Sequence, residues 1–188
     1  MTQKDPIAIV GGGIAGLSLA LALHQRGIAC EVFEAVPEVK EIGVGITLLP
    51  HAMRELTALG LLPALQAVAI ENLESVFFNR YGQFIYREPR GRHAGYDVPE
   101  LGIHRGKLHQ ILYRAAVERL GGDHVHTQHR CSHFEQTDDS VTVHFLPIAG
   151  NQPVPSVRAR LLVACDGVNS PIRRQLFPSD AVCFAGIN

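Results

Sequence analysis

The feature that most constrains this chain is a cluster of glycines between an apolar tetrapeptide and a helix-forming segment. Gly11, Gly13 and Gly16 fit the pattern G-x-G-x-x-G directly after the apolar residues 7–10. Four consecutive apolar residues are typical of a strand buried in a parallel sheet. Residues 14–26 have a helical pattern and precede a glycine suited to a helix end. The segment therefore predicts a strand, a tight turn and a helix.

Each position of the glycine pattern has a separate steric role. We expect Gly11 to permit the tight turn, Gly13 to let a pyrophosphate approach the backbone, and Gly16 to bring the helix close to the strand. The helix then begins at Ile14 and Ala15. Unpaired N–H groups and the helix dipole favour a phosphate at such a helix start. These five positions are the predicted pyrophosphate contacts.

An acid after the next predicted strand supplies the context that a bare glycine pattern lacks. Residues 30–34 are predicted to form this strand, which ends in Glu34 and is followed by Ala35. A carboxylate about 20 residues beyond the glycines accepts hydrogen bonds from a ribose, and its charge would repel a 2′-phosphate. We expect Glu34 and Ala35 to contact the adenosine part of a cofactor. The pattern does not separate FAD from NAD, and a glycine turn without a ligand is the alternative.

The rest of the chain predicts an α/β fold, with a Rossmann-like βαβ unit, a parallel sheet and a β-meander. Helices are expected over residues 50–59 and 107–120 and from Pro171, with Ser170 as its N-cap, to about residue 176. Strands are expected over 73–86 with a turn at 81–82, over 124–127, 133–136 and 141–145, and, as a buried parallel strand, over 160–165; loops are expected over 88–95 and 152–155.

Charge and hydropathy exclude several classes of partner. The 17 basic and 18 acidic residues are scattered and give a net charge of −1, so the sequence does not favour a nucleic acid or an anionic membrane as a partner. The apolar stretch over residues 7–23 is interrupted by four glycines. It is therefore not expected to be a secretory signal or a membrane span.

Cysteine and histidine spacing predicts neither a disulfide framework nor a metal site. The four cysteines are widely spaced without a C-x-x-C pair, which favours free thiols in a reducing cytoplasm. Four histidines cluster along the chain without acidic partners evident from the sequence. They are His124, His126, His129 and His133.

Two further segments carry a resemblance to a known family. Residues 103–108 contain His104 and Arg105 before the long predicted helix, and residues 164–173 contain Asp166-Gly167 followed by Ser170 and Arg173. Together with the glycine pattern, they resemble the group A flavoprotein monooxygenases, the para-hydroxybenzoate hydroxylase-like family. The likeness covers essentially the whole chain. Residues 21–25, 43–46, 88–91 and 104–106 are most similar to phenazine-modifying and salicylate hydroxylase-like members.

The resemblance implies roles in binding FAD. Arg105 would contact the phosphate or ribitol portion, Asp166 would hold ribitol hydroxyls, and Gly167 would leave space for the flavin. Residues 43–45, Gly45 included, would lie near the flavin ring, and Cys131 would offer backbone contacts to the adenine. A surface ion pair for Arg105 and an ordinary turn at Asp166-Gly167 are the alternatives.

The resemblance also implies an activity: FAD, NADH or NADPH, and O2 hydroxylate a small aromatic substrate, with no catalytic side chain expected in this chain. The family's later Gly-Asp motif and its substrate-covering sheet do not occur here. We therefore expect residues 1–180 to be an incomplete FAD-binding domain and residues 181–188 to be the first strand of a substrate domain. Such a part would be inactive alone and would self-associate through uncovered apolar surface. A non-catalytic nucleotide-binding module and an NAD-linked dehydrogenase are the alternatives.

Overall fold

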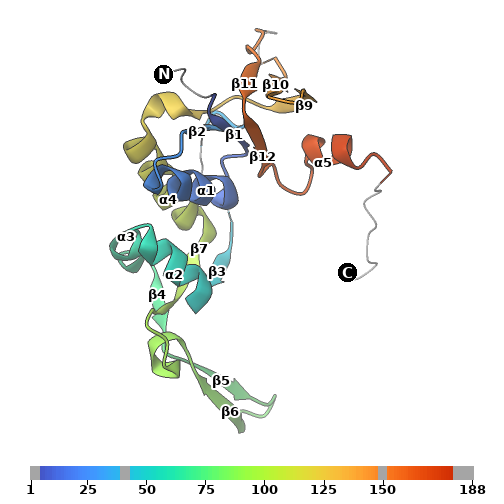
Figure 1. Ribbon diagram of the computed structural model, residues 1–188. Coiled ribbons are helices and arrows are strands. Elements are labelled where there is room, and N and C mark those ends of the chain that lie inside the picture. Colours follow the sequence, from blue (N-terminus) through green and yellow to red (C-terminus); the bar gives the residue numbers. More distant parts are fainter. Residues whose placement is uncertain (1–4, 39–42, 148–151, 180–188) are drawn as a thin grey trace. The chain divides into compact units, whose positions relative to one another are not determined.

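The computed structural model describes residues 5–38, 43–147 and 152–179 of the 188-residue chain (Figure 1). The chain divides into two compact units, one of residues 1–38 with 115–188 and the other of residues 39–114. The strand predicted over residues 181–188 lies outside the described part.

A four-stranded parallel sheet forms the centre of the first unit, in the order β12-β1-β2-β8. Its strands are β1 (Ile7–Val10), β2 (Cys30–Phe33), β8 (Val125–His126) and β12 (Leu161–Ala164). The predicted parallel βαβ unit is thus confirmed. The expectation that residues 160–165 form a buried strand is wrong in one respect, because β12 lies at the sheet edge and Leu161 is 52% exposed.

Helix α1 (Ile14–Gln25) connects β1 to β2 and lies beside both strands (Figure 1). It buries Leu17, Ala20 and Leu21, at the i, i+3 and i+4 positions that share one helix face. The helix ends before Gly27, whose φ of 67° is the left-handed conformation expected there. Helix α5 (Pro171–Leu176) follows β12 as predicted.

An antiparallel meander packs on the same unit. It consists of β9 (Cys131–Gln136), β10 (Val141–Phe145) and β11 (Val157–Ala159), in the order β11-β10-β9. Strand β10 alternates between buried and partly exposed residues, so one face joins the core and the other faces outward. The core face packs with Val10 and Phe33 of the parallel sheet. The short 3-10 helix η2 (Gly122–His124) precedes β8.

The second unit contains a small antiparallel sheet in the order β3-β7-β4. Its strands are β3 (Gly45–Leu48), β7 (Glu100–His104) and β4 (Ile70–Asn72), and its helices are α2 (Pro50–Ala58) and α3 (Leu62–Gln66). The predicted helix from residue 50 is confirmed, with Met53 and Leu56 buried. Helix α4 (Arg105–Leu120) starts two residues before the predicted position, and the division between the two units falls within it.

A hairpin of β5 (Glu74–Phe78) and β6 (Phe84–Pro89) extends from the second unit (Figure 1). It confirms the strands predicted over residues 73–86 and their turn, with Gly82 at a φ of 79°. The loop predicted over residues 88–95 is wrong, because β6 continues to Pro89 and the 3-10 helix η1 (Gly91–Ala94) follows.

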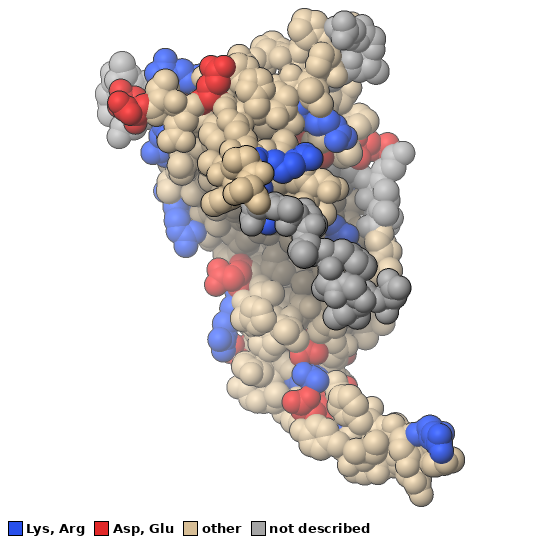
Figure 2. Space-filling model, turned by 90° about the vertical axis from the view of Figure 1, so that its right-hand side faces the viewer, with Lys and Arg blue, Asp and Glu red and all other residues tan. Residues whose placement is uncertain are grey.

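Charged residues of both signs are scattered over the face of the molecule that Figure 2 shows. This distribution agrees with the scatter seen along the sequence. No helix among the described residues is long and apolar enough to cross a membrane.

Candidate functional site

The glycine turn is tightly packed at its first and last positions. Gly11 has a φ of 107°, and a Cβ atom placed on it would lie 2.2 Å from the Cys165 carbonyl oxygen. A Cβ on Gly16 would lie 1.9 Å from the Gly11 carbonyl oxygen. A side chain at position 11 would therefore separate the turn from β12. A side chain at position 16 would separate α1 from β1. Both predicted steric roles are confirmed.

The middle of the turn is open instead. Gly13 is the N-cap of α1 and makes no side-chain capping bond, and the first turn of the helix contains no acid. A Cβ on Gly13 would meet no atom of the described structure within 4 Å. Helix N–H groups at an uncapped start that faces open space fit the phosphates of a dinucleotide.

Glu34 connects the end of β2 to the glycine turn. Its Oε2 accepts a hydrogen bond from the Gly12 amide at 2.7 Å, and its Oε1 accepts one from the Val36 amide at 2.9 Å. A carboxylate has about four acceptor positions, so these bonds leave capacity for a ribose hydroxyl. Ala35, the other predicted adenosine contact, is half-buried between Glu34 and Val36.

Gly12, between two predicted site residues, is a site residue that was not predicted. A Cβ on Gly12 would lie 2.9 Å from the Glu34 Cβ, so only glycine allows this approach of the two segments. The signal was present, because Gly12 is the middle of three consecutive glycines and the pattern G-x-G-x-x-G leaves its position unspecified.

The Asp166-Gly167 motif lies at the carboxyl end of β12, against the glycine turn. The Cys165 amide donates to the Val10 carbonyl at 2.7 Å, and a Cβ on Gly11 would also lie 2.9 Å from the Asp166 amide nitrogen. Gly167 has a φ of 77°. Two motifs far apart in the sequence thus meet at the carboxyl ends of the parallel strands, where open α/β folds bind their ligands.

Ser170 fixes the Asp166 carboxylate. Its hydroxyl donates to Asp166 Oδ2 at 2.8 Å and accepts from the Arg173 amide at 2.8 Å. The predicted N-cap is therefore confirmed, and the same side chain orients the acid of the motif. Ser170 is 6% exposed, so water competes little for either bond.

Two thiols near this motif are held in the protonated form. Burial, and to a lesser extent the negative charge of Asp166, raise the pKa of Cys131 to about 11. The pKa of Cys165 is raised by the same two causes. Cys30, Cys131 and Cys165 are free thiols, and Cys183 lies outside the described residues. Protonated thiols are weak nucleophiles at neutral pH.

The second unit brings together the other predicted contacts. His104 Nε2 lies 2.9 Å from the Gly43 carbonyl oxygen, and the Arg105 amide donates to the Val44 carbonyl at 3.0 Å. Gly45 pairs with His104 in the register of β3 and β7. A Cβ on Gly43, whose φ is 142°, would lie 3.2 Å from the Arg105 Cβ. The glycine segment and Arg105 are therefore neighbours, with Arg105 exposed at the start of α4.

The expectation that the clustered histidines lack acidic partners is wrong. His126 Nε2 lies 3.0 Å from Glu31 Oε2. His133 lies on the same face of the meander as Glu135 and His144. Strand pairing supplies Glu31 and His144, which the sequence did not indicate, whereas Glu135 follows His133 by two residues in the same strand.

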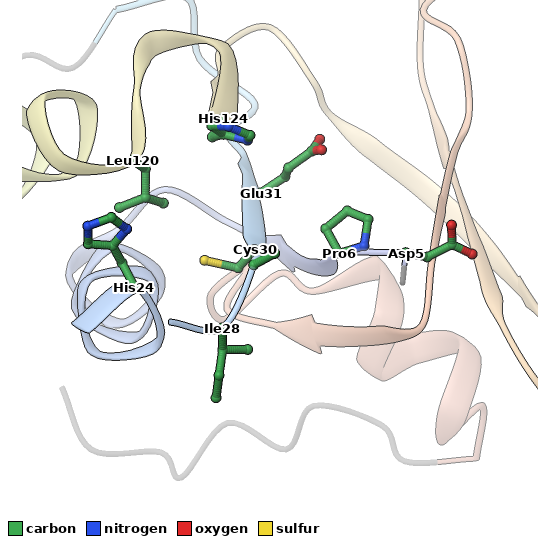
Figure 3. A pocket seen from close by; sticks show the side chains of 9 residues that line it. Asp5, Pro6, His24, Ile28, Cys30, Glu31, Leu120 and His124 are labelled. Atoms are coloured by element: carbon green, nitrogen blue, oxygen red, sulfur yellow. The ribbon is translucent and has the colours of Figure 1, made fainter. Parts of the chain in front are cut away.

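A cavity of about 420 Å³ lies at the other end of β1 from the glycine turn (Figure 3). Cys30 lies in its wall and points toward α1, where its thiol approaches the Ala20 carbonyl oxygen at 3.8 Å. The cavity is bounded by residues that precede β1 and begin β2. It is therefore distinct from the site formed by the two motifs.

The first unit has the three features of a dinucleotide-binding α/β protein. They are an uncapped helix start, an acid after the second strand and a parallel sheet. The chain matches the FAD binding domain family over residues 4–180 and belongs to it. FAD is thus the cofactor of this fold, as the resemblance implied.

Curated relatives agree with that resemblance. The chain is 41% identical over 178 residues to phenazine 1,6-dicarboxylic acid hydroxylase PhzS of Lysobacter antibioticus, covering 94% of this chain and 44% of that protein. It is 35% identical over 184 residues to 3-hydroxybenzoate 6-hydroxylase of Polaromonas naphthalenivorans, covering 96% and 44%. The likeness to phenazine-modifying members is confirmed. The chain spans less than half the length of these relatives.

Solved structures support the fold. HpxO of Klebsiella pneumoniae in complex with FAD matches with a TM-score of 0.72 at 26% identity, covering 91% of this chain and 42% of that one. The p-nitrophenol 4-monooxygenase PnpA of Pseudomonas putida matches with a TM-score of 0.80 at 23% identity, covering 94% and 44%. The expected fold class is therefore confirmed.

Proposed function

We propose that this chain is the FAD-binding part of a monooxygenase that hydroxylates a small aromatic or heteroaromatic compound with NADH or NADPH and O2. The observation that carries the proposal is the contact between the Gly11 turn and the Cys165–Asp166 peptide. It joins the two motifs in a chain that is 41% identical to a phenazine hydroxylase. Because the chain spans 44% of that relative, the activity is proposed for a protein that also carries the remaining part.

The contacts of the first unit support a separate role for its residues at each end of the cofactor. The start of α1, at Gly13, Ile14 and Ala15, holds the pyrophosphate, because its N–H groups are uncapped and the space before them is open. Glu34 and Ala35 hold the adenosine ribose, and the backbone of Cys131 contacts the adenine.

Asp166 binds ribitol hydroxyls while Ser170 fixes its orientation, and Gly167 leaves room for the flavin. In the second unit, Gly45 lines the flavin ring and Arg105 contacts the phosphate or ribitol portion, as the family resemblance implies. These roles follow from the resemblance residue by residue, and the local geometry of each unit supports them.

FAD supplies the redox chemistry when it is bound, by accepting a hydride equivalent and activating O2. The side chains of this chain bind and orient the cofactor. The neighbouring thiols of Cys131 and Cys165 are protonated at neutral pH because burial and Asp166 raise the pKa of each. We assign no catalytic acid or base to this chain. Free thiols at all three described cysteines favour a cytoplasmic location.

A visible absorption spectrum of the purified chain, taken before and after adding FAD and desalting, tests the cofactor assignment. We expect a flavin band that is retained by the wild type and weakened in Gly13→Val, because the valine side chain would occupy the open space at the helix start.

The matched control is Gly122→Val. A Cβ on Gly122 would also meet no described atom within 4 Å, and Gly122 does not have a positive φ. Equal flavin retention by both variants would contradict a pyrophosphate site at Gly13. Tight binding of NAD with no binding of FAD would overturn the proposed function as a whole.

A further inference from the structure

The outward face of the β9–β10 hairpin carries two histidines and a glutamate side by side. His133 and His144 are directly paired across the two antiparallel strands, and Glu135 lies two residues beyond His133 on the same face. One ligand atom from each of the three side chains lies within 4.8 Å of the others. Glu135 Oε1 and His144 Nε2 are 3.7 Å apart.

The hydrogen bonds around Ser132 set the tautomer of His133. The Ser132 hydroxyl donates its proton to the His144 carbonyl at 3.1 Å, so toward His133 Nδ1, at 2.9 Å, it can only accept. In neutral His133 the proton is then on Nδ1, and the Nε2 lone pair is available as a ligand. Metal-binding histidines are commonly oriented by a hydrogen bond to their second ring nitrogen in this way.

His144 offers the second nitrogen. Its Nε2 is shielded from solvent and has no hydrogen-bond partner among the residues that the structure describes. A shielded nitrogen without a partner is unfavourable unless a donor or a cation satisfies it. The nearest acidic atom, on Glu135, is too far away for a hydrogen bond.

The scaffold behind these side chains is anchored in the core. Phe134, Val141 and Val143 point to the opposite face of the hairpin, where they are buried in the core of the first unit. The ladder between β9 and β10 therefore fixes the backbone positions of all three outward side chains. Only the side-chain torsions remain to be adjusted.

We propose that His133, Glu135 and His144 form a binding site for a divalent transition-metal ion, with Zn²⁺ as the representative. Two imidazole nitrogens and one carboxylate oxygen suit Zn²⁺ far better than Ca²⁺ or Mg²⁺, which prefer oxygen ligands. The site joins two adjacent strands, so the ion would cross-link β9 to β10.

Binding requires a defined local change. The two imidazole rings are stacked with their centroids 4.4 Å apart and an interplanar angle of 4°. Ligand atoms around tetrahedral Zn²⁺ lie roughly 3.3–3.6 Å apart, given metal–ligand distances of about 2.0–2.2 Å. At least one ring therefore turns so that the two lone pairs converge. His133 and Glu135 are exposed, which leaves space for this rotation.

Isothermal titration of the metal-free chain, residues 1–188, with zinc chloride tests the proposal. We expect one Zn²⁺ bound per chain at this site and no comparable binding of Ca²⁺. His133→Gln and His144→Gln should each weaken the binding by well over about tenfold, and Ser132→Ala should weaken it less, by about tenfold. His124→Gln is the matched control, because His124 is exposed in η2, away from the hairpin.

Chemical shifts of the histidine ring nitrogens separate loss of a ligand from loss of the fold. On adding Zn²⁺, the signals of His133 and His144 should move in the wild type. Glu135→Gln, at an exposed position, should keep the wild-type spectrum without zinc and bind the ion more weakly. No zinc binding by the wild type, or wild-type affinity in both His133→Gln and His144→Gln, would overturn the proposal. So would shifts confined to other histidines.

Discussion

The Glu34 carboxylate accepts the amide proton of Gly12 at 2.7 Å, so the acid at the end of β2 is part of the glycine turn itself. A second oxygen of the same group accepts from Val36. The acid therefore has a structural role that is present before any ribose binds.

Replacing Glu34 should consequently reduce both stability and FAD affinity. Glu34→Ala leaves two backbone donors without their charged acceptor, and we expect a loss of about 1–3 kcal/mol in the free energy of unfolding. Urea denaturation without FAD measures this loss, and a flavin titration measures the affinity. Glu118→Ala, at an exposed position of α4, is the control. An unchanged urea midpoint for Glu34→Ala would contradict the structural role.

Ser170 offers a second test, because one hydroxyl both caps α5 and holds Asp166. Ser170→Ala should cost about 0.5–2 kcal/mol in the free energy of unfolding, as for other helix N-caps. It should also lower FAD affinity because Asp166 loses its anchor. Ser170→Thr keeps the hydroxyl and should retain most of both quantities. If Ser170→Ala lowers stability but binds FAD as the wild type does, Ser170 does not position a cofactor ligand.

The raised pKa of Cys131 predicts a loss of stability at alkaline pH. Unfolding returns this pKa from about 11 toward its ordinary value of 9.0, so between those values the unfolded chain releases a proton that the folded chain keeps. The contribution of the Cys131 thiol to the free energy of unfolding is then fully present below about pH 9 and declines as the pH rises toward 11. Urea midpoints across this range should fall more steeply for the wild type than for Cys131→Ala. Parallel profiles would show that Cys131 makes no such contribution.

The β5–β6 hairpin should cause self-association. Five large apolar side chains on it are between 49% and 62% exposed, namely Phe77, Phe78, Phe84, Ile85 and Tyr86. Apolar surface of this kind on a two-stranded ribbon marks a contact surface or an aggregation site. Light scattering after size exclusion should show a mass that rises with protein concentration.

The double substitution Phe84→Ser with Ile85→Thr should lower that mass toward the monomer value. Val168→Thr is the control, because Val168 is a single exposed apolar residue, 88% accessible, in the other unit. A wild-type chain that stays monomeric at every concentration would refute the prediction.

Local patterns predicted much of the first unit. The strand, turn, helix and strand over residues 7–34 follow from apolar runs and glycines, which act within a few residues. The Ser170 cap and Pro171 likewise predicted α5. Strands β3 and β7 were not predicted, because such short segments acquire their conformation from each other.

The remaining differences are also non-local. β12 is as apolar as a central strand, yet pairing leaves it at the edge of the sheet. His144 becomes a partner of His133 only through the register of the β9–β10 ladder. Arg105 was expected to precede the long helix but is the first residue of α4. The two motifs and their family were predicted, while the bonds that hold Glu34 and Asp166 required the structure.

The packing of Gly11 against the Cys165 carbonyl has a consequence for how the chain folds. The first βαβ unit is complete by Phe33. The contact between the glycine turn and Cys165 forms only when β12, more than a hundred residues later, pairs with β1. Contacts of such large sequence separation form slowly. A flavin that binds only the finished turn would stabilise the late pairing by mass action. Binding of the cofactor to a newly synthesised chain would therefore require that these two distant strands have already paired.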